Sequence, residues 1–158
     1  MKKLKLYIET SVWNFLFADD APEKMKITKR FFRDEEIRRF DLFVSEIVLA
    51  EINDATDLKR GRLLKEIGKH NPEILYLNAE VDAIAGQYMK NGLLTEKHID
   101  DIYHLAYATV NGMDILLSWN MRHIVKRRTQ LIVELTNKAL GYRKLEIWTP
   151  EELMEDDS

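Results

Sequence analysis

Hydrophobic residues along this chain gather in five short runs, separated by longer segments in which they recur at helical spacing. The runs lie at 4–8, 41–45, 73–77, 113–119 and 144–148. Each has the length of a strand and is rich in aliphatic and aromatic residues. Strands that alternate with helices are typical of a parallel sheet covered by helices on both faces. The pattern therefore predicts an α/β fold with helices in excess.

Turn and capping residues divide the remaining segments into helices. Asparagine, threonine and proline favour helix starts, and glycine favours helix ends. These residues are Pro22 in the first turn of a helix, Asn78 before 79–90, Asn91 and Gly92 after it, Thr95 and Asn111–Gly112 around the next helix, and Gly141 after about 127–140. We expect one domain over residues 1–158, with 154–158 as a disordered acidic tail.

Composition excludes several classes of protein. The 158 residues are 46% hydrophobic and 32% charged, which is typical of a folded globular chain. There is no cysteine, so disulfides and thiolate chemistry are excluded. No run approaches the roughly 18 apolar residues of a membrane span. We therefore expect a cytoplasmic protein without a membrane partner.

The net charge of −3 does not by itself indicate nucleic-acid binding. One segment is locally basic: MRHIVKRR at 121–128, which carries Arg122, Lys126, Arg127 and Arg128. These four side chains are candidates for RNA binding, and the alternative is a solvated helix face.

Glu9 directly follows the first hydrophobic run, in LYIETSVW. The carboxyl ends of parallel strands are where ligands collect in open α/β sheets. A buried carboxylate there is unfavourable unless something compensates its charge. Glu9 either caps the helix that follows, near its positive end, or shares its site with a cation.

Two further acids interrupt hydrophobic helix faces. In the helix predicted from about Ser45, Glu51 lies in the middle of an apolar stripe made by Ile47, Val48, Ile52 and Ala55. In the helix after Thr95, Asp101 lies at the border of the inner face. Asp100 turns further toward water, where it fits a first-turn acid that the helix dipole favours.

Asn120 follows the run 113–119 as Glu9 follows the first run, although it is also an ordinary turn residue. Glu9, Glu51, Asp101 and Asn120 would together place three carboxylates and one amide at one sheet edge. Carboxylates so close require a proton or a cation, and oxygen ligands favour Mg²⁺ or Mn²⁺. We expect all four residues to be catalytic, with Glu9, Asp101 and Asn120 as metal ligands in phosphodiester hydrolysis.

On these segments the chain resembles the PIN-domain family, particularly the VapC-type toxin ribonucleases of toxin–antitoxin pairs. The matching segments follow the family's order over nearly the whole chain: LYIETSVW, SEIVLAEI, DDIYHLAYATVNGMDILLSWNMRHI and LGYRKLEIWTPEEL. The resemblance implies a Rossmann-like sheet of five parallel strands, a Mg²⁺ or Mn²⁺ site and endoribonuclease activity. It also implies an antitoxin that covers the acidic crevice, and a homodimer.

In the resemblance, Glu51 and Asp101 match the family's second and third acids, Glu9 stands where aspartate is usual, and Asn120 replaces a fourth acid. These two departures leave open a catalytically weakened PIN-like domain that acts by binding RNA or protein. A receiver-like signalling domain would need an aspartate at the position of Glu9. Secondary candidates near the site are Asp100, Thr10, Ser11, His104 and His123. For both histidines, the alternative is an ordinary place on a helix surface.

Overall fold

A computed structural model of the chain describes residues 2–33, 35–93 and 98–155. Five strands form one sheet in the order β3-β2-β1-β4-β5, and every neighbouring pair is parallel. The strands are β1 Leu4–Ile8, β2 Phe40–Ser45, β3 Glu73–Leu75, β4 Ile115–Leu117 and β5 Glu146–Trp148. The prediction of a Rossmann-like α/β fold with five parallel strands is confirmed.

Three strands are shorter than the hydrophobic runs that predicted them. β3, β4 and β5 each have 3 residues. At the end of the run 73–77, Tyr76 and Leu77 are 64% and 51% exposed. The backbone N–H of Leu77 donates to the carboxylate of Glu46 at 2.7 Å, so it is not available to a neighbouring strand. A hydrophobic run therefore marks the strand but not its ends.

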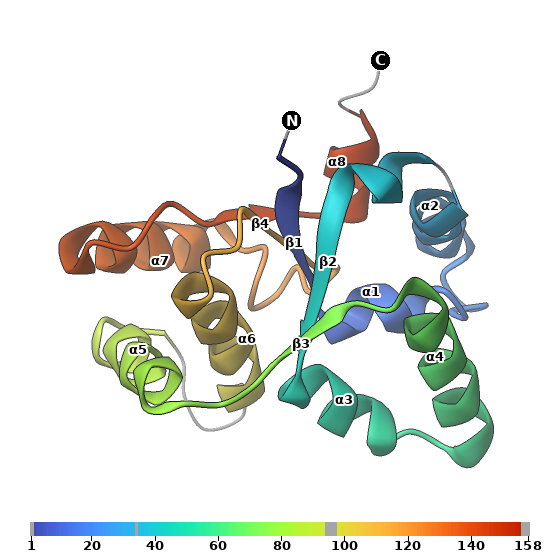
Figure 1. Cartoon of the computed structure of the whole chain (residues 1–158), viewed down its shortest axis with the longest axis horizontal. Coiled ribbons are helices and arrows are strands. Elements are labelled where there is room, and N and C mark those ends of the chain that lie inside the picture. The colour runs from blue at the N-terminus through green and yellow to red at the C-terminus, as the bar shows by residue number, and fades with distance from the viewer. Residues whose placement is uncertain (1, 34, 94–97, 156–158) are drawn as a thin grey trace.

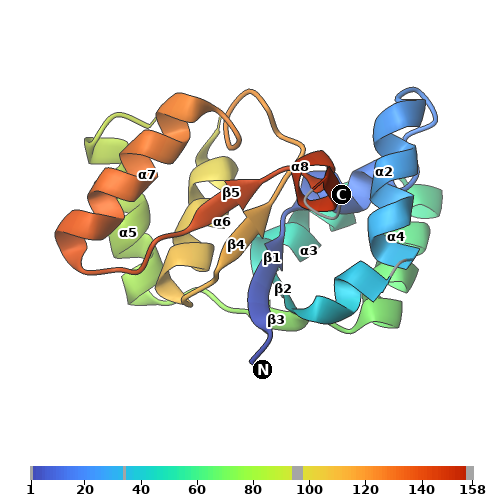
Figure 2. The same ribbon diagram turned by 90° about the horizontal axis from the view of Figure 1, so that it is seen from above.

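Helices cover both faces of the sheet. Figures 1 and 2 show α5, α6 and α7 on one side of it and α1, α2, α4 and α8 on the other. Their bounds are α1 Thr10–Phe15, α2 Pro22–Arg33, α3 Glu46–Asn53, α4 Asp57–His70, α5 Ala79–Lys90, α6 Ile99–Val110, α7 Arg127–Leu140 and α8 Pro150–Glu155, with a 3₁₀ helix, η1, at Glu35–Arg39. No helix in these described ranges has the length and apolar character to span a membrane.

Most predicted helix ends agree with the structure. Asn78 caps α5 by accepting the Val81 N–H at 2.9 Å, and Gly141 ends α7 with φ at 82°. Thr95 lies outside the described residues. The predicted tail is wrong for its first two residues, because Met154 and Glu155 belong to α8 and Met154 is buried. Residues 156–158 lie outside the described part of the chain.

The order of the strands decides where a site can form. The chain places β2 and β3 on one side of β1, then crosses to place β4 and β5 on the other side. In such a sheet the crevice between the carboxyl ends of β1 and β4 is the usual place for a ligand. β1 and β4 are also the centre of the core, with Leu6, Ile8 and Leu116 fully buried. Side chains that follow these two strands are thus held on a rigid base.

Candidate functional site

Glu9 occupies the crevice at the end of β1 and caps α1. Its side chain is only 5% exposed. The carboxylate accepts hydrogen bonds from the Ser11 N–H at 3.0 Å, the Ser11 hydroxyl at 2.5 Å and the Ser118 hydroxyl at 2.5 Å. These donors compensate the burial of the charge. The predicted capping role is therefore present, and the same bonds fix the orientation of the carboxylate.

Glu51 reaches the crevice from α3, with 32% of its side chain exposed. Its Oε1 accepts a hydrogen bond from the Thr10 hydroxyl at 2.7 Å, and it lies 2.6 Å from Nε2 of His104. Burial alone would raise the pKa of Glu51, but the hydrogen bond and charge of His104 and the bond from Thr10 outweigh burial and lower it. Glu51 is thus ionised at neutral pH.

His104 lies at the centre of the site, on α6, and is fully buried. The alternative of a helix-surface histidine is therefore wrong for this residue. Its Nδ1 is 2.6 Å from the Tyr7 hydroxyl, which is itself 2.7 Å from the Ser45 hydroxyl. Burial lowers the pKa of His104, yet the hydrogen bond to Glu51 and the charges of the three acids produce a net increase. His104 is thus held between Glu51 on one side and the Tyr7 hydroxyl on the other.

Asp101 lies in the first turn of α6, as predicted, and Asp100 beside it is exposed. Burial, followed by the charge of Glu9, raises the pKa of Asp101 to about 6, with a smaller contribution from Glu51. His104 and His98 oppose this increase. The three acids are therefore close enough to interact through their charges, and the negative potential at Asp101 is only partly neutralised.

Asn120 lies beside Asp101 but faces it through nitrogen. Its Nδ2 donates to Asp101 Oδ1 at 3.1 Å, and its Oδ1 accepts the His123 N–H at 3.1 Å. The oxygen expected to bind a metal thus holds the turn after β4, and an amide N–H does not bind a cation. Asn120 as a metal ligand stays a prediction that would require its amide group to rotate.

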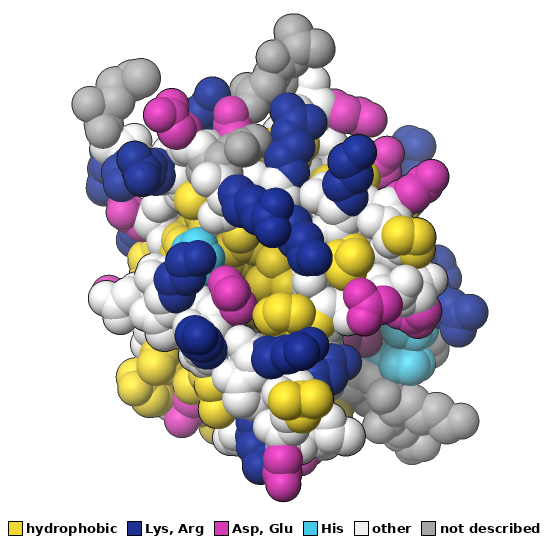
Figure 3. Space-filling model, turned by 90° about the vertical axis from the view of Figure 1, so that its right-hand side faces the viewer, with side chains coloured by type: hydrophobic (Ala, Val, Ile, Leu, Met, Phe, Trp, Pro, Cys, Tyr) yellow, Lys and Arg dark blue, Asp and Glu magenta, His cyan; other side chains and the backbone are white. Residues whose placement is uncertain are grey.

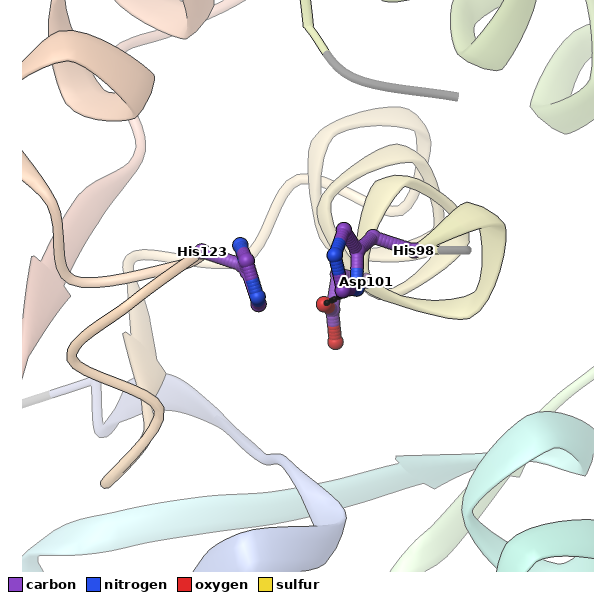
Figure 4. A group of neighbouring side chains, drawn as sticks. All are labelled: His98, Asp101 and His123. Atoms are coloured by element: carbon purple, nitrogen blue, oxygen red, sulfur yellow. Dashed lines mark ion pairs between the residues drawn. The ribbon is translucent and has the colours of Figure 1, made fainter. Parts of the chain in front are cut away.

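The potential ligands divide into two groups within the described residues. In each group, one ligand atom from every residue lies within 4.8 Å of the others: Glu9 with Glu51 and His104, and Asp101 with His98 and His123. Figure 4 shows the second group, with His98 and Asp101 on the start of α6 and His123 reaching toward them from the loop that follows β4. Glu9 and Glu51 thus belong to one group, whereas Asp101, which is hydrogen-bonded to Asn120, belongs to the other.

Three of the four basic candidates border this crevice. Arg122, Lys126 and Arg128 line a cavity of about 200 Å³ together with Asp101, His98 and His123. Burial and the charges of His98, Lys126 and Arg122 lower the pKa of His123. Arg127, the first residue of α7, is exposed and is not part of this lining. An anion that entered the cavity would meet positive charge next to the acids.

A second surface lies on the side of the molecule formed by α2 and α4. Figure 3 shows Lys and Arg side chains gathered there around exposed hydrophobic ones. A groove on this side is lined by Phe15 and Phe17 and by Lys59 and Arg62 of α4. The Arg62 guanidinium lies 5.7 Å from the centre of the Phe17 ring. We call it the α1–α4 groove.

The crevice has the composition of a site for a hard divalent cation. Glu9, Glu51 and Asp101 offer carboxylate oxygens, and burial together with the charges of Glu9 and Glu51 raises the pKa of Asp101, so a positive group beside it would be favourable. A divalent ion is such a group, and oxygen donors suit Mg²⁺ and Mn²⁺.

Several residues of the site were not predicted. Ser118 and Tyr7 carry hydrogen bonds to Glu9 and His104, but a serine in a turn and a tyrosine in a strand have no distinguishing pattern. No sequence pattern indicates His98 either, because it lies near His123 only through packing between α6 and the loop after β4.

No family model matches the sequence, and no curated protein is similar to it in sequence. Solved structures do resemble it. One is a chain of the VapBC2 complex from Rickettsia felis bound to a promoter DNA fragment, with a TM-score of 0.56, 12% identity and coverage of 92% of this chain and 98% of that one. Another is VapC20 from Mycobacterium tuberculosis, a toxin that cleaves the sarcin–ricin loop, with a TM-score of 0.55, 15% identity and coverage of 89% and 98%.

Proposed function

The chain has the fold of VapC-type PIN domains, and on that premise we propose that it is a metal-dependent endoribonuclease that hydrolyses RNA phosphodiester bonds. One observation carries the proposal: Glu9 at the end of β1 and Asp101 in the first turn of α6 lie close enough for their charges to interact, and burial with these charges raises the pKa of Asp101 to about 6. Three interacting carboxylates at the ligand-binding edge of an α/β sheet are suited to a divalent ion and phosphoryl chemistry.

Glu9 and Asp101 would hold Mg²⁺ or Mn²⁺, with Glu51 beside them. Such an ion neutralises charge on the phosphate and lowers the pKa of water. The chain's own residues provide the arrangement. Ser11 and Ser118 fix Glu9, while Thr10 and His104 keep Glu51 ionised and oriented. In this proposal Asn120 positions Asp101 through its Nδ2.

RNA would enter from the side of the basic cavity. Arg122, Lys126 and Arg128 border Asp101 and carry no acidic partner closer than 4.0 Å among the ion pairs of the described residues. Their role would be to bind phosphates on either side of the cleaved bond, since contacts to the backbone set the register of a nucleic acid. Arg127 does not line the cavity, so it would add only to the positive potential around it.

We further propose that the protein is the toxin of a type II toxin–antitoxin pair in the cytoplasm. The Rickettsia felis structure is a VapBC2 complex, which supports a protein partner for this chain too. The α1–α4 groove combines apolar rings with Lys59, Arg62 and one acid, Asp20, so its excess of positive charge fits a partner segment that carries both apolar and acidic residues. A homodimer, expected from the family resemblance, stays a prediction.

The test is cleavage of single-stranded and structured RNA by the purified protein with added Mg²⁺ or Mn²⁺. We expect cleavage by the wild type, none in EDTA, and a loss of at least about 100-fold in Asp101→Asn. Asp100→Asn is the matched control, because Asp100 is a neighbouring acid that is exposed. Equal cleavage by the wild type and Asp101→Asn would refute the proposal.

The second candidate is a PIN-like domain that binds RNA or protein without efficient catalysis. It is favoured by two observations: His104 already pairs with Glu51, and Asn120 turns nitrogen toward Asp101. Calorimetric titration with Mn²⁺ separates the two functions. RNA binding without any metal binding would favour this candidate.

A further inference from the structure

The second group of potential ligands contains two histidines and one acid: His98, His123 and Asp101. The rings of His98 and His123 are stacked with their centres 3.6 Å apart and their planes at 26°. Asp101 Oδ2 lies 3.9 Å from Nδ1 of His98. We propose that His98, Asp101 and His123 form a second metal site, which binds Zn²⁺ and related transition-metal ions (Figure 4).

The donor set determines which ions the site would take. Two imidazole nitrogens and one carboxylate oxygen suit Zn²⁺, Co²⁺ or Ni²⁺, whereas Mg²⁺ prefers oxygen ligands throughout. With three protein ligands, water would complete the coordination. All three side chains are partly exposed at the mouth of the cavity, so water has access to them.

The fold brings the three ligands together from two elements. His98 is the residue before α6 and Asp101 lies three positions later, so both are on one face of the helix start. His123 is fixed in the loop after β4 because its N–H donates to Asn120. The two rings lie nearly parallel, so both can bind one ion only if one ring turns about its Cβ–Cγ bond, a soft torsion in histidine.

The surrounding charge limits the affinity. Arg122, Lys126 and Arg128 line the same cavity, and their positive charges disfavour a bound cation. The negative charges of Glu9 and Glu51, which act on Asp101, favour one. A bound ion would also engage the carboxylate on which the proposed nuclease site depends. Zn²⁺ would therefore inhibit RNA cleavage in competition with Mn²⁺, and this consequence alone rests on the proposed function.

The site is tested by binding, without any measurement of catalysis. The full chain, stripped of metal, is titrated with ZnCl₂ in a calorimeter and with CoCl₂ by visible absorption, in which bound Co²⁺ with nitrogen ligands gives intensified bands. We expect one ion per chain. His98→Gln and His123→Gln should each weaken Zn²⁺ binding at least about tenfold, since even outer partners of a metal site contribute 10–100-fold. Glu134→Gln, at an exposed position of α7, should bind as the wild type does.

Two results would overturn the inference. One is the absence of Zn²⁺ binding to the folded wild type. The other is binding that survives both histidine substitutions and is lost in Glu51→Gln, which would place the ion with Glu9, Glu51 and His104. Circular dichroism of each variant distinguishes loss of a ligand from loss of folding. Zn²⁺ binding in a protein that cleaves no RNA would support this site and refute only the proposed function.

Discussion

Replacing Asp101 by asparagine is expected to stabilise the metal-free protein at neutral pH. Burial and the neighbouring acids raise the pKa of Asp101 from 3.8 to about 6. At about 1.4 kcal/mol per pKa unit, this shift corresponds to about 3 kcal/mol of unfavourable free energy for the ionised form. The side chain is 17% exposed. Solvent screening reduces the figure, so we expect a gain of about 1–2 kcal/mol in the free energy of unfolding.

The substitution removes the charge and little else. Asparagine has the shape of aspartate, and its Oδ1 can still accept the hydrogen bond that Asn120 Nδ2 donates at 3.1 Å. A gain in stability that accompanies a loss of activity is characteristic of residues placed for function.

The sign of the pH dependence follows from the direction of the shift. Because the pKa of Asp101 is raised in the folded protein, the folded state binds the proton more tightly than the unfolded chain does. The unfavourable contribution is absent below pH 3.8 and complete above about pH 6. The advantage of Asp101→Asn over the wild type should therefore be large at neutral pH and small near pH 4.

The assay is urea unfolding in EDTA, followed by the fluorescence of the 3 tryptophans. Asp100→Asn is the control, and it should lose about 0.5 kcal/mol because it removes a first-turn acid of α6. Mn²⁺ should stabilise the wild type more than Asp101→Asn. A lower stability of Asp101→Asn at neutral pH, or an equal gain at both pH values, would refute the electrostatic reasoning.

Three further predictions concern the supporting residues. His104→Gln disrupts the buried pair with Glu51 and should lower the free energy of unfolding by about 3 kcal/mol in urea titrations; a change within about 0.5 kcal/mol would contradict the pairing. Ser118→Ala removes a donor to the buried Glu9 carboxylate and should cost about 1–2 kcal/mol in the same assay, and no loss at all would mean that Ser118 does not support Glu9. The salt dependence of RNA binding is the slope of the logarithm of the binding constant against the logarithm of the salt concentration, measured by fluorescence anisotropy. This slope should decrease by about one in each of Arg122→Gln, Lys126→Gln and Arg128→Gln. Arg127→Gln is the matched control with a smaller effect, and an effect as large as the others would contradict the cavity as the RNA-binding surface.

Local pattern was sufficient for the fold and for the neighbourhood of the acids. Strand-length hydrophobic runs, helical spacing and residues such as Asn78 and Gly141 act within a few positions of the chain, so they are visible in the sequence. Glu9 and Asn120 follow two runs, and parallel strands end at the same edge of a sheet. The strand order then places both residues at the crevice between β1 and β4.

Tertiary packing decided the partners within that crevice. His104 and Glu51 are 53 residues apart and meet only because α3 and α6 pack at the same end of the sheet. The turn after β4 determines that Asn120 uses its oxygen for the His123 N–H, which leaves nitrogen for Asp101. The stacking of His98 on His123 depends on the same two elements. Sequence thus determined which helices and strands carry the polar residues, since periodicity and strand ends are local properties. Which hydrogen-bond partner or counter-charge each group has was decided by contacts between distant segments.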